Sequence, residues 1–142
     1  MPSDPDCIFC KIAAGHVPVA RIAESPQALA FLDVGPIATG HALIIPREHY
    51  ETLMDMPEDR LAAVYAMAAH VASALTRALG AEGVNVLQNN GRCAGQVVPH
   101  MHVHVIPRSA GDGIKWPWPA TKADPDALET LARRIVSRLD AP

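Results

Sequence analysis

The chain has 142 residues, the length of one ordinary domain, which is enough to bury a hydrophobic core. Hydrophobic residues make up 49% of it and charged residues 19%, as in soluble globular proteins. The formal net charge is -3 with neutral histidines, which excludes a general electrostatic attraction to nucleic acid. We therefore expect no nucleic-acid partner, and any contact with a nucleotide must come from a local site.

In chain order, the pattern first predicts three short strands and a long helix. The strands are apolar or alternating segments separated by Gly, Pro, Asp or Ser, at residues 19–24, 28–33 and 42–46. The helix begins near Pro57, a residue suited to the first helical position. It repeats apolar residues at spacings of three and four from Leu61 to Leu79 and ends at Gly80.

Two more strands and a second helix follow. Residues 84–89 and 100–106 flank a Gly-rich loop, which predicts that these strands pair as a hairpin. Asp124 followed by Pro125 is typical of a helix start, and an apolar stripe predicts a C-terminal helix after it. This order of elements predicts an α+β fold with a mainly antiparallel five-stranded sheet and a single domain.

The N-terminal sequence MPSDPDC is acidic and lacks the basic and apolar regions of a signal peptide. No apolar run reaches the roughly 18 residues needed to cross a bilayer, so we expect no membrane partner. These two features predict a cytoplasmic protein.

The fifth predicted strand contains the run PHMHVHV at residues 99–105. Because side chains alternate along a strand, we expect His100, His102 and His104 on one face and apolar side chains on the other. Imidazole binds metals, and near neutral pH it also transfers protons or attacks electrophiles. A middle histidine with a histidine on either side is typical of an activated nucleophile. The alternative is a protein in which all the histidines bind metal.

The run from Gly95 to Val105 resembles the H-φ-H-φ-H-φ signature of the histidine triad (HIT) family of nucleotide hydrolases and transferases. The resemblance continues, in the same order, through residues 7–12, 30–33 and 40–49. It covers roughly residues 7–108 and implies a HIT-like fold, with a C-terminal arm and helix over 109–142. It also implies hydrolysis or transfer at the α-phosphate of a nucleotide, such as a nucleoside phosphoramidate or a dinucleoside polyphosphate, with a purine base expected.

The resemblance assigns a role to each matching residue. It implies that His102 attacks the α-phosphorus and forms a nucleotidyl-histidine intermediate, with support from His104 and His41. In relatives without metal, His100 is the candidate proton donor to the leaving group. Asn89 and Gln96 are implied to hold phosphate, and Asp33 is implied to bind the ribose hydroxyls. The apolar residues expected around the base and ribose, for which core packing is the alternative, are Phe9, Ile12, Val17, Phe31, Val34 and Leu43.

Cys7 and Cys10 have the spacing of half a zinc site, and His49 and His100 would complete a tetrahedral set. The same combination resembles several bacterial HIT proteins and the galactose-1-phosphate uridylyltransferase branch, which implies a structural zinc ion. A zinc-bound His100 cannot also protonate a leaving group. The alternative is a pair of reduced, buried thiols, and a redox disulfide is disfavoured because the pair does not follow a strand in a βαβ pattern.

Two further expectations come from the resemblance and the C-terminal arm. The family resemblance implies a homodimer, to which the Ala-rich helix of residues 61–79 could contribute. Trp116 and Trp118 either line the leaving-group side of the pocket or fix the arm to the core. A nucleotide-binding or interaction module with little catalysis remains the alternative function.

Overall fold

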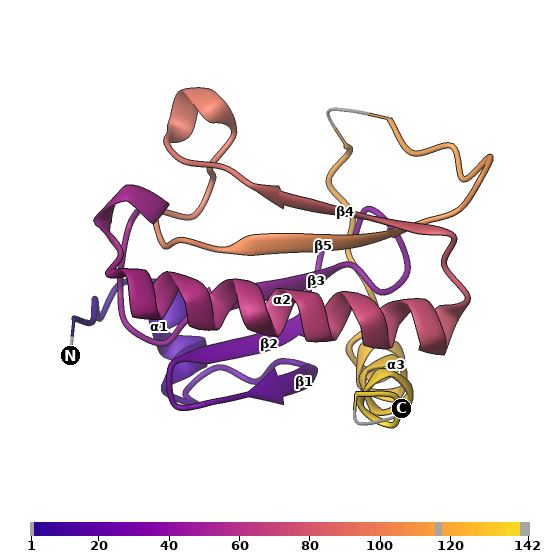
Figure 1. Cartoon of the computed structure of the whole chain (residues 1–142), viewed down its shortest axis with the longest axis horizontal. Helices are drawn as coiled ribbons and strands as arrows, with labels where there is room; N and C mark the ends of the chain where they lie inside the picture. Colours follow the sequence, from indigo (N-terminus) through magenta and orange to yellow (C-terminus); the bar gives the residue numbers. More distant parts are fainter. Residues whose placement is uncertain (1, 116–117, 140–142) are drawn as a thin grey trace.

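The computed structural model describes residues 2–115 and 118–139, and within them five strands form one antiparallel sheet of order β1-β2-β3-β5-β4 (Figure 1). The strands are β1 (Arg21–Glu24), β2 (Ala28–Leu32), β3 (Ala42–Pro46), β4 (Gly83–Gln88) and β5 (Val103–Arg108). The predicted α+β class, the antiparallel sheet and the hairpin of the last two strands are confirmed.

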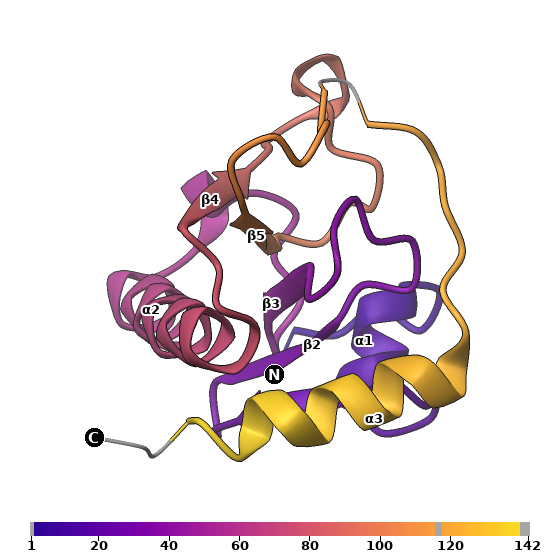
Figure 2. The ribbon, with the colours of Figure 1, turned by 90° about the vertical axis from the view of Figure 1, so that its right-hand side faces the viewer.

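The helices lie on opposite faces of this sheet (Figure 2). They are α1 (Ile8–Ala13), α2 (Glu58–Leu79) and α3 (Pro125–Val136), with short 3-10 turns at Leu53–Asp55 and Arg92–Ala94. Alternate residues of each strand face one side or the other. Ala30 and Ile44 pack against α2 and α3, whereas Phe31 and Leu43 pack against α1. Because α2 and α3 pack on one face, a ligand-binding site is expected on the other face, beside α1.

Helix α2 runs along the sheet and ends where the sequence predicts, because Gly80 adopts the left-handed conformation with φ of 66°. Pro57 is its N-cap with extended backbone, so the helix begins one residue later than predicted. By length and mean hydropathy (1.2) α2 could cross a membrane, which corrects the statement that no apolar run is long enough. Here Val64, Val71 and Leu75 are fully buried in the core between α2 and the sheet.

Strand β5 begins at Val103, three residues later than predicted. The reason is local, because the N–H of His100 donates to the Val98 carbonyl (2.8 Å) and the N–H of Met101 to the Tyr50 carbonyl (2.7 Å). Neither group is available to a neighbouring strand. The alternation still holds, since Met101 and Val103 are buried in the core on the α2 face.

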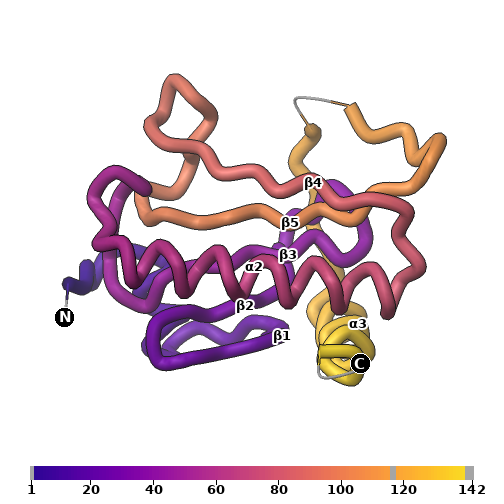
Figure 3. Tube along the Cα trace, viewed as in Figure 1, coloured from indigo at the N-terminus to yellow at the C-terminus, as the bar shows by residue number. Residues whose placement is uncertain are grey.

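The arm between β5 and α3 loops away from the sheet and returns to α3, as the trace in Figure 3 shows. On its return it is bonded to the loop after β2. The Thr121 hydroxyl donates to the Pro36 carbonyl (2.6 Å), and the N–H of Ala123 donates to the Val34 carbonyl (2.9 Å). These bonds bring the arm beside the α1 face of the sheet.

Candidate active site and metal centre

A cavity of about 370 Å³ opens on the α1 face. It brings together most of the predicted nucleotide and catalytic residues, namely Phe9, Ile12, Phe31, Asp33, Val34, Leu43, Asn89, His102 and His104. The other lining residues are Ile8, Val19, Gly95, Val97, Val98 and Trp118. The predicted residues Val17, His41, Gln96 and His100 do not line it. The wall is mostly apolar, and its polar side chains are Asp33, Asn89, His102 and His104, a composition typical of small-molecule sites.

His102 is held by its own backbone neighbourhood. Its Nδ1 atom lies 2.7 Å from the carbonyl oxygen of His100, and because a carbonyl only accepts, Nδ1–H is the donor. The other ring nitrogen, Nε2, is then unprotonated in the neutral ring. Burial lowers the pKa of His102, which is 7% exposed, so its ring is neutral at pH 7. An oriented, unprotonated ring nitrogen in a cavity is what a histidine nucleophile requires.

His41 and His104 form a directional hydrogen-bonded pair behind the cavity. The N–H of Ile37 donates to Nδ1 of His41 (3.1 Å), which places the His41 proton on Nε2. This Nε2 lies 2.9 Å from Nδ1 of His104 and donates to it. The proton of His104 is therefore on its own Nε2. These tautomers follow from the hydrogen-bond partners of each ring.

Burial controls the charge of this histidine cluster. It lowers the pKa of His104 to about 3 and that of His100 to about 4. It also lowers the pKa of His41, although the nearby Asp33 carboxylate acts in the opposite direction. Four buried imidazoles are thus neutral near pH 7, because charging one in this packed environment costs hydration energy.

Asp33 joins the His41–His104 pair to the cavity. One carboxylate oxygen accepts the N–H of Gly35 (2.8 Å), and the other lies 3.5 Å from Nε2 of His41. Its neighbour Val34 is 62% exposed at the rim of the cavity. The carboxylate is therefore fixed in place and still open to a polar ligand.

Asn89 and Gln96 differ in what their amides can do. Asn89 lines the cavity, with its Nδ2 donating to the Gly95 carbonyl (3.4 Å). Gln96 is buried, and its oxygen accepts the N–H of Gly91 (2.7 Å). The Gln96 NH₂ group donates to backbone carbonyls at Glu51 (2.6 Å) and Val98 (3.1 Å). Gln96 thus braces the loop, and no amide donor of this side chain is left for phosphate.

The loop between β4 and β5 depends on glycine. Gly95 has φ of +98°, a conformation that other residues rarely adopt. A Cβ atom there would lie 3.2 Å from the Asn89 amide nitrogen. The backbone at Gly95 and the Asn89 side chain can therefore approach each other closely in the wall of the cavity.

Trp118 covers the buried histidine pair. Its ring lies edge-on to His104 and His41, with centroid distances of 5.5 and 5.8 Å. This position agrees with the prediction that the arm lines the pocket, and Trp118 supplies a wall that none of the motifs contains. Trp116, the other tryptophan of the prediction, lies outside the described residues.

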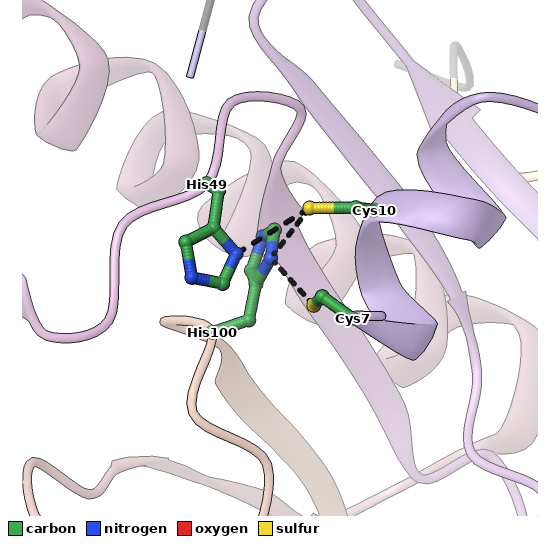
Figure 4. A group of neighbouring side chains, drawn as sticks. All are labelled: Cys7, Cys10, His49 and His100. Carbon is green, nitrogen blue, oxygen red and sulfur yellow. Dashed lines mark hydrogen bonds between the residues drawn. The ribbon is translucent and has the colours of Figure 1, made fainter. Parts of the chain in front are cut away.

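A second cluster, next to the cavity, combines two cysteines and two histidines (Figure 4). Cys7 and Cys10 come from the start of α1, His49 from the loop after β3, and His100 from the segment before β5. One donor atom from each lies within 4.8 Å of all the others. The Nδ1 atom of His100 is 3.3 Å from the Cys7 sulfur and 3.6 Å from the Cys10 sulfur. Nδ1 of His49 is 3.4 Å from the Cys10 sulfur.

The geometry of this cluster fits a tetrahedral metal ion. Sulfur and nitrogen ligands of one zinc ion, at about 2.3 and 2.0–2.1 Å from it, lie about 3.5 Å apart. The Nε2 atom of His100 is 3.0 Å from the Pro46 carbonyl and donates to it, so the lone pair of Nδ1 faces the sulfurs. Metal-bound histidines usually donate their second N–H in this way. The donor set Cys7, Cys10, His49 and His100 therefore fits zinc, as the sequence predicts.

A family model described as the HIT domain matches residues 14–111, more than half of the chain. The chain belongs to the HIT family. Adenosine 5'-monophosphoramidase hnt1 of Schizosaccharomyces pombe is 40% identical to it over 94% of the chain and 98% of that relative. Adenylylsulfatase HINT3 of Arabidopsis thaliana is 38% identical over 93% of the chain and 66% of that relative.

Solved HIT structures have the same fold. A Zn-bound histidine triad family protein from Mycobacterium smegmatis matches with a TM-score of 0.84 and 36% identity, covering 94% of this chain and 93% of the other. A Hit-like protein involved in cell-cycle regulation from Bartonella henselae matches with a TM-score of 0.89 and 31% identity, covering 97% and 99%. The HIT-like fold predicted from the sequence is thereby confirmed.

Sequence reasoning about this HIT protein missed several lining residues. Ile8 is the second residue of the Cys7–Cys10 motif and could have been found, because a helix through the motif turns adjacent side chains to different sides. Val97 and Trp118 carry no such signal. Their positions depend on the loop before β5 and on the arm before α3, which are set by tertiary contacts.

Proposed function

We propose that this protein is an enzyme that hydrolyses or transfers nucleotides at the α-phosphorus, through a nucleotidyl intermediate on His102. The observation that carries the proposal is the single tautomer of His102, which leaves an unprotonated Nε2 in a cavity. The neighbouring His104 lines the same cavity, and its ring proton is on Nε2. The names of the hnt1 and HINT3 relatives, a phosphoramidase and an adenylylsulfatase, support the same reaction class.

The proposed reaction has two steps. The Nε2 lone pair of His102 attacks the α-phosphorus, a P–Nε2 bond forms, and the bond from phosphorus to the leaving group breaks. Water then attacks phosphorus and releases His102 and the nucleoside monophosphate. For a phosphoramidate, the departing nitrogen takes up one proton from solvent as the P–N bond breaks; in the second step water supplies the new hydroxyl group and returns one proton to solvent, so the two steps balance. The Nε2–H of His104 and the Asn89 amide are placed to stabilise the phosphoryl oxygens.

The same cavity offers a place for the nucleoside. Phe9 and Phe31 give it an aromatic wall, with ring centroids 5.9 Å apart, and Val34 lies at its rim. The fixed carboxylate of Asp33 suits the ribose hydroxyls, which are hydrogen-bond donors. We propose a purine base here, because the larger ring system buries more area against these side chains.

Turnover of adenosine 5'-phosphoramidate and of a diadenosine polyphosphate by the purified protein tests this function. We expect hydrolysis in the wild type and loss of at least about a thousandfold in His102→Asn, since a nucleophile is removed. Mass spectrometry of quenched reactions should detect the nucleotidyl adduct in the wild type and not in the variant. His16→Gln, which changes an exposed histidine outside the cavity, is the control. Full activity of His102→Asn would overturn the mechanism.

The alternative function, a nucleotide-binding module with little catalysis, gives a different result in the same experiment. AMP would bind, but no adduct and no turnover would be detected with any of these substrates. The complete set of oriented, neutral histidines favours the enzyme.

We propose that Cys7, Cys10, His49 and His100 hold a structural zinc ion. The donor spacing and the Zn-bound relative from M. smegmatis support this. His100 then acts as an anchor, and its assigned role as proton donor to the leaving group would apply only to a metal-free protein. Metal analysis of the purified protein tests the assignment.

We propose a cytoplasmic homodimer as the assembled form. In support of a dimer, β4 is an edge strand whose Val86 side chain is 52% exposed, and Tyr65 on α2 is also exposed. Exposed apolar groups at a sheet edge are favourable for association. Light scattering of the purified protein gives the mass in solution, and a monomeric mass at micromolar concentration would contradict the dimer.

A further inference from the structure

Helix α1 faces the metal cluster and the nucleotide cavity at once. Cys7, at its N-cap, and Cys10 belong to the cluster, whereas Ile8, Phe9 and Ile12 line the cavity. The helix has only six residues and no side-chain cap. Because so short a helix is unstable alone, its position depends on the contacts that hold it.

Phe9 links the two sites directly. Its ring centroid lies 5.0 Å from that of His102 and 5.7 Å from that of His100, and both contacts are edge-on. The nucleophile and a metal ligand are therefore packed against the same side chain. A displacement of α1 would change the cavity wall and the packing of His102 together.

A second link runs through the backbone. The ring of His100 directs Nδ1 to the cysteine sulfurs, and its carbonyl oxygen accepts the Nδ1–H of His102 at 2.7 Å. One residue thus belongs to the metal cluster and also sets the tautomer and orientation of the nucleophile. Fixing the His100 ring on a metal ion would restrain this carbonyl as well.

From these two links we infer that metal binding at Cys7, Cys10, His49 and His100 and nucleotide binding in the cavity are coupled, each increasing the affinity for the other. This inference rests on the proposed zinc and nucleotide sites and goes beyond them. The four metal ligands act as positioning residues for the nucleotide. By thermodynamic linkage, the factor by which zinc tightens AMP equals the factor by which AMP tightens zinc.

The test starts from the zinc-loaded protein. The equilibrium distribution of zinc between the protein and a coloured chelator is measured with and without saturating AMP, and we expect AMP to raise the affinity for zinc by about tenfold, within the usual range of coupling. The AMP dissociation constant is then measured by calorimetry on zinc-loaded and metal-free samples, and we expect a similar factor. Cobalt-substituted protein gives a third measurement, because the sulfur-to-cobalt absorption band should shift when AMP binds.

Two variants separate coupling from simple loss of affinity. Phe9→Leu removes the ring that packs against His102 and His100 but leaves all four metal donors, so we expect the coupling factor to fall toward one. Val34→Ala is the matched control, because Val34 lines the same cavity from the loop after β2. It should weaken AMP binding equally in both metal states and leave the coupling factor unchanged.

The outcomes also distinguish this inference from the zinc and enzyme proposals on which it rests. If zinc binds but AMP leaves the zinc affinity unchanged and zinc leaves the AMP dissociation constant unchanged, the coupling is wrong and the zinc and enzyme assignments stand. If no zinc binds, both the coupling and the zinc assignment are overturned. The adduct on His102 tests the enzyme mechanism separately from both.

Discussion

The Nε2 atom of His41 lies 2.9 Å from the Nδ1 atom of His104, and the His41 ring is completely buried. This hydrogen bond is lost when both rings are protonated, because neither ring then has a nitrogen that can accept it. Burial lowers the pKa of both rings, that of His104 to about 3. The pair therefore contributes to the fold in its neutral form.

This relationship predicts loss of stability in mild acid. Histidines in the unfolded chain have their ordinary pKa of about 6.5, so below that pH the unfolded state binds more protons than the folded state. The free energy of unfolding should therefore decrease as the pH falls from about 6.5 toward the folded-state pKa of His104, about 3. Each such histidine contributes up to about 1.4 kcal/mol per pH unit. Urea unfolding at pH 8, 6.5 and 5.5 measures the slope.

The His104→Gln variant checks the origin of this slope. It loses an imidazole that is costly to charge, so its stability should depend less on pH between 6.5 and 5.5 than that of the wild type. Its stability at pH 8 serves as the reference, which separates the slope from any loss of packing. An unchanged slope would show that the acid sensitivity has another source.

Removal of zinc should lower the melting temperature by about 10 °C. A ligand present at about 1,000 times its dissociation constant stabilises the folded state by about 4 kcal/mol. In a domain of this size each kcal/mol shifts the melting temperature by roughly 2–4 °C. Scanning calorimetry before and after chelation measures the change. Cys10→Ala should no longer respond to the chelator, whereas Cys93→Ala, which removes an exposed thiol outside the cluster, should respond as the wild type does.

The sequence predicts those parts of the fold whose signals are local and repeated. The spacing from Leu61 to Leu79 and the glycine after it define α2, and strand alternation places Met101 and Val103 in the core. The sequence does not predict helix α1, because six residues are too few to show the apolar periodicity of a helix and Cys7 provides no side-chain cap. Its position is set by packing against Phe31 and Leu43, which are distant in the sequence.

For the candidate site too, the sequence predicts some features and not others. The Cys7–Cys10 spacing, together with the HIT resemblance, predicts that these cysteines lie near His49 and His100, and one donor atom from each of the four residues lies within 4.8 Å of the others. For Gln96 the sequence predicts a phosphate contact, whereas in the structure its amide N–H groups donate to backbone carbonyls. Its amide is bonded to the carbonyl of Glu51, 45 positions away, and no local pattern reveals such a contact.

Gln96 and Asn89 should therefore respond differently to substitution. Gln96→Ala removes the hydrogen bonds from this side chain to the backbone at Gly91, Glu51 and Val98, which we expect to lower the stability by about 1–3 kcal/mol. Its effect on AMP affinity should be less than about threefold. Asn89→Ala should change stability little and reduce turnover by about tenfold or more, since its amide lines the cavity. Unfolding curves and kinetics of both variants give the comparison, and equal effects on turnover would contradict it.

Trp118 should control the hydration of the His41–His104 pair. Its ring lies edge-on to both imidazoles, so Trp118→Ala admits water to His104 and should raise the pKa of that ring from about 3 toward its ordinary value. Nuclear magnetic resonance titration of the labelled histidines measures this pKa directly. Thr121→Val is the control, because it removes the hydrogen bond from the arm to the Pro36 carbonyl and keeps the indole. If Trp118 only fixes the arm, the two substitutions should shift the pKa alike. If the indole itself excludes water, as we expect, Trp118→Ala should shift it more.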